Sequence, residues 1–107
     1  MSGIVVVAEN GSGRYQQAIT VGQHQLIADE PESLGGNDAG PAPFDLLMAG
    51  LGACTSITLR MYAERKALNL TQVSVALSHE KIELDGVKRD RIQRTITLTG
   101  DLSLIHI

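Results

Sequence analysis

The stretch that decides the fold is residues 35–66, GGNDAGPAPFDLLMAGLGACTSITLRMYAERK. Its first part is rich in glycine and proline, which is typical of a loop. A long apolar run follows and predicts a helix from about Pro43, where proline is tolerated in a first turn, to about Leu68. Asp45 near the start and Arg65 near the end have the charges that the helix dipole favours. We therefore expect a loop followed by one central helix of roughly 25 residues.

This helix is apolar on nearly all sides of its first four turns. At about 100° per residue, six residues share one face of the helix: Leu47, Gly50, Leu51, Cys54, Thr58 and Met61. Such a helix should be buried on most sides. Gly50 and Gly52 each cost up to about 1 kcal/mol relative to alanine in a helix interior. Their presence predicts close approach of another backbone, most simply a second copy of the same helix.

Short strands precede the helix. Residues 3–9 and 14–21 are predicted to form a hairpin around Asn10-Gly11, a dipeptide that favours tight turns. Residues 24–28, with His24, Leu26 and Ala28 at alternate positions, predict a third short strand. The fold class is therefore mixed α and β, with antiparallel strands before the helix.

A second hairpin is predicted after the helix. Val73, Val75 and Leu77 alternate with polar residues, and Asp85-Gly86 marks the turn into a return strand at 91–99. The alternation changes phase near Glu80, which predicts a β-bulge there and puts Ile82 and Leu84 inward. Arg94 falls on the same face as the apolar residues of the return strand.

Composition narrows the function classes. The chain has 107 residues, so it forms at most one domain. Its net charge is −3 and it has three aromatic residues, which makes it a poor candidate for binding nucleic acid. One cysteine allows no internal disulfide, which indicates a reducing compartment such as the cytoplasm. The sequence shows no signal peptide and no run of the roughly 20 apolar residues that a membrane span needs.

Cys54 is the residue that invites a chemical interpretation. A free cysteine on an apolar helix is most often a small buried hydrophobic residue. If it is instead a reactive thiolate, a nearby cation must stabilise it, because a mid-helix position gains nothing from the dipole. Arg14 and Arg94 are the two candidates. We expect no metal site and no cofactor, since the histidines lack partners at ligand spacing and the glycine-rich loop lacks the phosphate-loop lysine.

The segment GPAPFDLLMAGLGACTSITLRMYAERK resembles the central helix of the OsmC/Ohr family, most of all the OsmC-like branch. The preceding DEP…GGNDAGP and the following VSVALSH also match that branch. The resemblance covers about residues 4–101. It implies an α/β fold in which two subunits intertwine around paired central helices. It also implies a thiol-dependent peroxidase that reduces organic hydroperoxides in defence against oxidative stress, with a hydroperoxide and a thiol reductant as partners.

Carried over by position, the resemblance implies that Cys54 is the peroxidatic cysteine and Arg14 the arginine that stabilises its thiolate. The family's glutamate partner falls at Phe44, and Asp45 beside it should point away from Cys54. Replacement of that glutamate supports an alternative function, in which a non-enzymatic dimer of the same fold binds a small apolar ligand at its interface. A second, resolving cysteine is absent from this sequence.

The last six residues, LSLIHI at 102–107, look like a translated sequencing adapter. We therefore expect an OsmC-like domain over residues 1–101 that is incomplete at its C-terminus, and a non-native tail at 102–107. On this expectation the natural protein continues past about Asp101, and the peroxidase activity of the given chain is impaired, because without a resolving cysteine its turnover needs an outside thiol.

Overall fold

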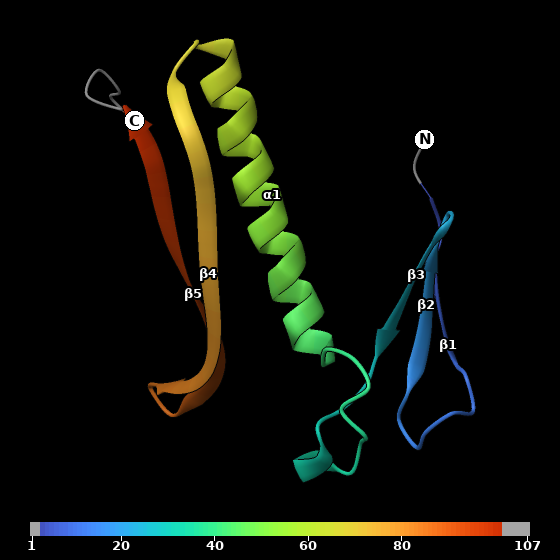
Figure 1. Ribbon diagram of the computed structural model, residues 1–107. Coiled ribbons are helices and arrows are strands. Elements are labelled where there is room, and N and C mark those ends of the chain that lie inside the picture. Colours follow the sequence, from blue (N-terminus) through green and yellow to red (C-terminus); the bar gives the residue numbers. More distant parts are fainter. Residues whose placement is uncertain (1–2, 102–107) are drawn as a thin grey trace. The chain divides into compact units, whose positions relative to one another are not determined.

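The computed structural model describes residues 3–101 (Figure 1). The chain forms two compact units, one up to Leu46 and one from Leu47 onward. Antiparallel strands come first, then one long helix, then a hairpin. The predicted mixed α and β fold is therefore confirmed. The expectation about the tail at 102–107 lies outside the described residues.

The N-terminal unit contains a three-stranded antiparallel sheet in the order β1-β2-β3. Its strands are β1 (Val5–Glu9), β2 (Gln17–Val21) and β3 (His24–Ala28), coloured blue to teal in Figure 1. The predicted turn is present: Gly11 has a φ of +75°, and the Ser12 backbone N–H donates to Asn10 Oδ1 at 2.9 Å. The second strand begins at Gln17, later than predicted, because residues 10–16 form the longer loop around this turn.

Strand β1 has no cover in the described chain. All five of its residues are exposed, although four of them are apolar. In the neighbouring strands, only Ile19 and Ala28 are buried apolar residues. An exposed apolar edge strand is a surface that proteins normally cover or pair.

Residues 29–42 fold back over the end of β3. A single 3-10 turn, η1 (Glu32–Leu34), lies within this loop. The Asp29 backbone N–H donates to the Pro41 carbonyl and the Asp38 N–H donates to the Glu30 carbonyl, each at 3.1 Å. A Cβ on Gly36 would overlap the Glu30 carbonyl oxygen, so only glycine allows this close approach.

The central helix is α1 (Pro43–Arg65), about 35 Å long. At its start, Asp45 Oδ2 accepts a hydrogen bond from the Ala42 backbone N–H at 3.1 Å, which supports the N-terminus as a capping residue does. The helix ends three residues before the predicted Leu68. Ala67 adopts a left-handed φ of +54°, and its N–H bonds to the Glu64 carbonyl, which turns the chain into the next strand.

The C-terminal hairpin consists of β4 (Asn69–Leu84) and β5 (Val87–Asp101). Asp85 and Gly86 both have positive φ, as a tight two-residue hairpin turn requires, so the predicted turn is confirmed. The predicted bulge near Glu80 is wrong, because the register is continuous from Gln72 to Leu84 and is shifted between Leu70 and Gln72.

One close approach between the two strands explains the position of this shift. Gly100 lies opposite Leu70, and a Cβ on it would overlap the Asn69 carbonyl oxygen. The crowding of the two backbones is thus at the base of the hairpin. Since the pairing continues unbroken toward the tip, Ile82 and Leu84 face away from Val75 and Leu77, and Leu84 is 53% exposed.

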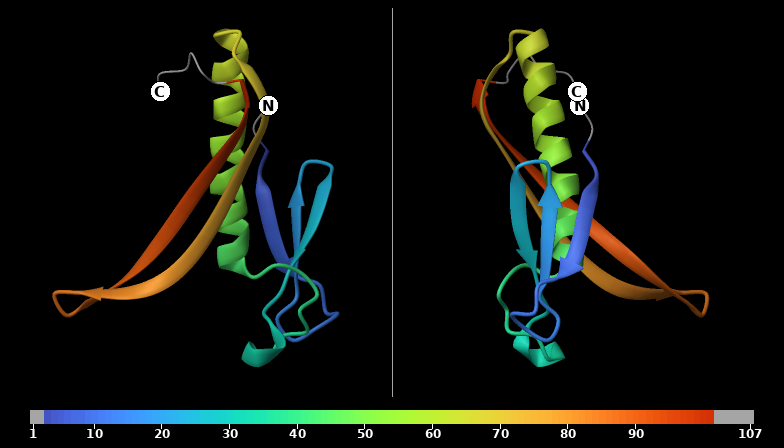
Figure 2. Two further views of the ribbon diagram at one scale, coloured as in Figure 1. Left: turned by 60° about the vertical axis from the view of Figure 1, so that its left-hand side comes forward. Right: turned by 90° about the vertical axis from the view of Figure 1, so that its right-hand side faces the viewer.

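Helix α1 lies alongside β4 in the C-terminal unit, whereas the hairpin tip curves away from it (Figures 1 and 2). Ala63 is buried on the hairpin side of the helix, and Arg60 Nη1 donates to the Leu70 carbonyl at 2.6 Å. A Cβ on Gly52 would lie 2.7 Å from Leu77 Cδ1. A close neighbour of Gly52 within its own chain is therefore the Leu77 side chain of β4, and the second copy of the helix stays a prediction.

The expectation that α1 is buried on most sides is wrong for the single chain. Only Gly52 and Ala63 are buried in the helix, because the hairpin covers one side of it. All six residues of the face predicted above are exposed, and we call them the exposed helix face: Leu47, Gly50, Leu51, Cys54, Thr58 and Met61. A Cβ on Gly50 would meet no atom within 4 Å.

The apolar character of α1 has a second consequence. By length and composition alone, with a mean hydropathy of 1.3, it is long and apolar enough to cross a membrane, contrary to the expectation that the sequence has no such run. The core helix of a soluble protein has the same properties, so one such helix is weak evidence for a membrane span.

Candidate functional site

Cys54 lies near the middle of α1 and is exposed. The interpretation of this cysteine as a buried hydrophobic residue is therefore wrong for the single chain. Its side chain opens into a groove of about 320 Å³. Residues of α1 and β5 line this groove, which we call the Cys54 groove: Leu51, Cys54, Thr55, Thr58, Leu59, Arg94 and Ile96.

Arg94 brings a positive charge to the Cys54 groove. It lies in β5 opposite Leu77, on the side of the hairpin that carries Val75 and Ile96, as the alternation predicted. Its Nη1 donates a hydrogen bond of 2.8 Å to Thr55 Oγ1 on α1. The Thr55 hydroxyl in turn donates to the Leu51 carbonyl at 2.9 Å. The guanidinium is thereby tied to the helix one residue away from Cys54.

Arg14 has a different setting. It precedes β2 in the N-terminal unit, and its guanidinium carbon lies 4.8 Å from the centroid of the Tyr15 ring, a cation–π contact. A Cβ on Gly35 would lie 3.4 Å from Arg14 Nη1. Of the two candidate cations, Arg94 lines the Cys54 groove. The role of Arg14 in the chemistry of Cys54 stays a prediction.

The structure also places Thr58 and Asp45, two other residues considered from the sequence. Thr58 lines the Cys54 groove one turn beyond Cys54. Asp45 serves the start of the helix, which agrees with the sequence-based assignment of a dipole partner rather than a catalytic group. Within residues 3–101, no group of three or more His, Cys, Asp or Glu side chains is placed to hold a metal ion.

Asp29 is a structurally important residue to which the sequence analysis assigned no role of its own. Its side chain is 2% exposed. Oδ1 accepts the Glu30 backbone N–H at 2.8 Å, and Oδ2 accepts those of Asn37 and Ala39 at 3.1 Å each. Burial works to raise the pKa of Asp29, but the three backbone N–H groups favour the carboxylate, and the net pKa is lowered.

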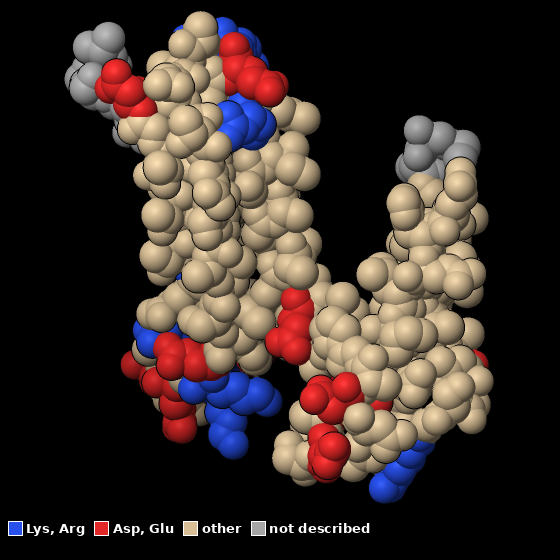
Figure 3. Space-filling view, viewed as in Figure 1, with Lys and Arg blue, Asp and Glu red and all other residues tan. Residues whose placement is uncertain are grey.

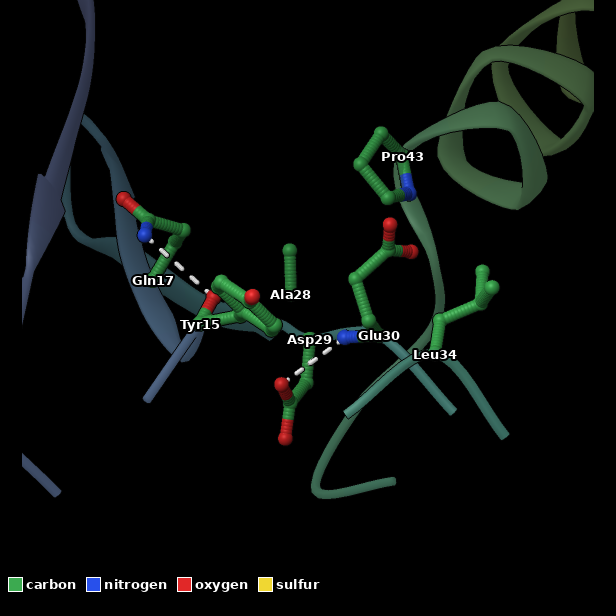
Figure 4. Close-up of a pocket in the computed structure, with 7 residues that line it drawn as sticks. All are labelled: Tyr15, Gln17, Ala28, Asp29, Glu30, Leu34 and Pro43. Carbon is green, nitrogen blue, oxygen red and sulfur yellow. Dashed lines mark hydrogen bonds between the residues drawn. The ribbon is translucent and has the colours of Figure 1, made fainter. Parts of the chain in front are cut away.

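The Asp29 bonds close a loop that also shapes a pocket of about 440 Å³ in the N-terminal unit. Figure 4 shows its lining, with the Tyr15 ring, Leu34 and Pro43 as apolar walls and the bond from the Glu30 N–H to Asp29 below them. An aspartate followed by a glycine-rich run is the sequence signal that could have predicted this loop closure.

We expect the stability of the protein to fall at acid pH through Asp29. A carboxyl whose pKa is lowered in the folded state contributes stability above its unfolded value of about 3.9, and this contribution is lost as pH falls through the lower folded value. Asp29→Asn should therefore lower the free energy of unfolding at pH 6 and weaken its decline toward pH 3. Urea unfolding at both pH values measures this.

The matched control for this prediction is Asp38→Asn. Asp38 is exposed and lies in the same loop. Its substitution should leave both the stability at pH 6 and the acid dependence close to those of the parent chain. An equal loss of acid dependence in the two variants would contradict the assignment to Asp29.

Comparison with known proteins decides the family. Residues 35–104, more than half of the chain, match the family described as OsmC-like protein. This chain belongs to the OsmC-like protein family. The family predicted from the GACT helix is thus confirmed, and the matched region includes α1, the Cys54 groove and the whole C-terminal hairpin.

A solved structure gives the fold of this OsmC-like chain independently. It is that of an organic hydroperoxide resistance protein OsmC from Legionella pneumophila, described as a predicted redox protein and regulator of sulfide bond formation. The match has a TM-score of 0.69 and 19% sequence identity, and covers 94% of this chain and 72% of that chain. At this identity the likeness shows the OsmC fold alone. No curated protein matches the sequence.

Proposed function

We propose that this OsmC-like chain reduces organic hydroperoxides with Cys54 as the nucleophile. The observation that carries the proposal is the exposure of Cys54 in a groove that combines apolar walls with one guanidinium. A reactive cysteine needs access to its substrate and a nearby cation, and this setting offers both. The family and its relative described as a hydroperoxide resistance protein support the same chemistry.

The proposed reaction balances as a two-electron reduction. The Cys54 thiolate attacks one oxygen of the hydroperoxide, the S–O bond forms and the O–O bond breaks. The alkoxide that leaves takes a proton from water and departs as an alcohol, and Cys54 becomes a sulfenic acid. An external thiol then attacks the sulfur to form a mixed disulfide and water, and a second thiol releases Cys54. Because this sequence has one cysteine, both thiols come from outside it.

The lining of the groove favours hydroperoxides with an apolar body. Leu51, Leu59 and Ile96 are aliphatic, and they offer an alkyl or aryl substituent a surface away from water. Hydrogen peroxide has no apolar substituent, so these side chains do not favour its binding. We therefore propose that the substrates are organic hydroperoxides and that a reducing compartment such as the cytoplasm supplies the thiol.

We also propose that the working form is a homodimer in which a second copy packs on the exposed helix face at Leu47, Gly50 and Met61, which do not line the Cys54 groove. Of these residues, Leu47 is 59% and Met61 is 62% exposed, and such large apolar side chains are normally covered. Figure 3 shows charged side chains gathered at the two ends of the helix and hairpin, with uncharged residues along most of the length between them. An identical surface is the natural partner for an uncharged face, since it brings no unpaired charge.

The test of the proposed function is the consumption of cumene hydroperoxide in the presence of dithiothreitol. We expect many turnovers per chain above the rate without protein, and at least about tenfold slower consumption of hydrogen peroxide, which is the discrimination that one apolar contact supplies. Saturable binding of cumene hydroperoxide without consumption would contradict the enzyme and support the non-enzymatic ligand-binding dimer.

A further inference from the structure

We propose that Thr55 positions Arg94 in the Cys54 groove, and that Arg94 is the cation that stabilises the Cys54 thiolate. This inference rests on the part of the proposed function that makes Cys54 a reactive thiol. It starts from the hydrogen bond of 2.8 Å between Arg94 Nη1 and Thr55 Oγ1, which joins two residues 39 positions apart in the sequence. Thr55 is thus a positioning residue, and Arg94 is the charged group that lines the Cys54 groove.

The direction of the hydrogen bonds makes Thr55 suited to this task. Its hydroxyl proton is used in the bond of 2.9 Å to the Leu51 carbonyl. A hydroxyl has two acceptor lone pairs besides its single donor, so Thr55 Oγ1 meets Arg94 as an acceptor only. Because the Leu51 carbonyl belongs to the backbone of α1, the orientation of the hydroxyl is set by the helix itself.

Arg94 keeps most of its donor capacity after this bond. A guanidinium has five N–H donors in a planar fork, and the bond to Thr55 uses one of them. The others remain for an anion in the groove. Cys54 and Arg94 are the only ionisable side chains among the described residues that line it.

The charge of Arg94 is also not neutralised by a carboxylate. Within residues 3–101, the hairpin's ion pairs join His79 with Asp90 and Arg91 with Glu80, and none includes Arg94. Arg94 instead occupies an apolar row of β5 between Ile92 and Ile96, with Leu77 opposite. An arginine at this position costs the strand the packing that an apolar side chain would give there. Its charge is available to the anionic sulfur of Cys54.

The experiment measures how fast iodoacetamide alkylates Cys54 between pH 6 and 9, followed by mass spectrometry of intact chains with matching circular dichroism. We expect Arg94→Gln and Thr55→Val to alkylate about three- to tenfold more slowly at pH 7, with the rise in rate moved to higher pH. Thr55→Ser keeps the acceptor and should retain the parent rate. Arg94→Lys keeps the charge and should lose less than Arg94→Gln, which separates charge from folding effects.

Arg89→Gln is the matched control, because it removes an exposed cation of β5 that does not line the Cys54 groove. We expect it to leave the alkylation profile unchanged. The inference is overturned if Thr55→Val alkylates at the parent rate, or if Arg14→Gln alone slows the reaction. Hydroperoxide turnover is measured on the same variants. A parent chain that shows no turnover but an Arg94-dependent alkylation rate would contradict the proposed peroxidase and support this inference.

Discussion

Replacing Cys54 with serine is expected to lower thiol-dependent consumption of organic hydroperoxide by about a thousandfold or more. The nucleophile in the proposed reaction is a thiolate, and a serine hydroxyl is almost entirely un-ionised near neutral pH. The substitution removes one polarisable atom from an exposed position, so the fold should be unaffected. The measurement is the rate of cumene hydroperoxide loss with dithiothreitol in excess.

A matched control for Cys54→Ser is Thr58→Ser. Thr58 lies one turn further along the exposed helix face and also lines the Cys54 groove, but it has no sulfur. It should keep most of the activity. If Cys54→Ser consumed peroxide at a rate within a few fold of the parent chain, the consumption would not come from this thiol and the proposed function would be wrong.

The single cysteine also sets the expected stoichiometry. Without an added thiol, the 107-residue chain should consume about one equivalent of hydroperoxide and stop, since its sulfenic acid has no second cysteine to attack it. With a dithiol present, turnover should continue. Mass spectrometry of the Cys54 peptide should show a single added oxygen first and sulfinic acid on longer exposure. Sustained consumption with no thiol present would contradict this chemistry.

The second large effect is expected at Gly50, in the proposed dimer contact. Gly50→Leu should weaken self-association by about 1–3 kcal/mol, or roughly ten- to a hundredfold in dissociation constant, because a bulky side chain would overpack a contact built around glycine. The isolated chain offers open space there, with no atom within 4 Å of a Cβ. Leucine also has a higher helix propensity than glycine, by up to about 1 kcal/mol. The same substitution should therefore leave the monomer as stable or more so.

Analytical ultracentrifugation over a concentration series, paired with thermal unfolding, separates these two effects. Ala53→Leu is the matched control, since Ala53 is also exposed on α1 but lies outside the exposed helix face. It should leave the dissociation constant within a few fold of the parent value. A parent chain that stays monomeric at high micromolar concentration would contradict the dimer, and equal weakening by both variants would contradict this helix face as the contact.

Much of the secondary structure was predictable because its signals are local. Asn10-Gly11 and Asp85-Gly86 mark turns through their own backbone preferences, and Pro43 marks the start of α1 in the same way. The alternation of Val73, Val75 and Leu77 likewise placed a strand and its inward face. Where the prediction failed, a non-local contact decided: the bulge follows the crowding of Gly100 against Asn69 rather than the phase of the apolar residues.

The candidate site could also be predicted from the sequence only in part. Cys54 was found from the sequence, because a lone thiol in the family's helix segment is visible in any arrangement of the chain. The choice between Arg14 and Arg94 could not be predicted from the sequence, because it depends on the packing of β5 against α1, which brings Arg94 to Thr55. Asp29 was missed as well. The backbone N–H groups of Asn37 and Ala39 that bind its carboxylate are 8 and 10 residues away and converge only in the folded loop.

The sequence by itself thus determined the order of the elements, the family and the cysteine on which the proposed function rests, all of which depend on local pattern and identity. Only the tertiary structure decided which side of α1 is covered and which arginine shares a groove with Cys54. The physical reason is that burial and pairing depend on which surfaces meet, and residues far apart in the chain meet through the packing of whole elements. Leu77 against Gly52 covers one side of the helix, and the side with Gly50 and Cys54 stays open.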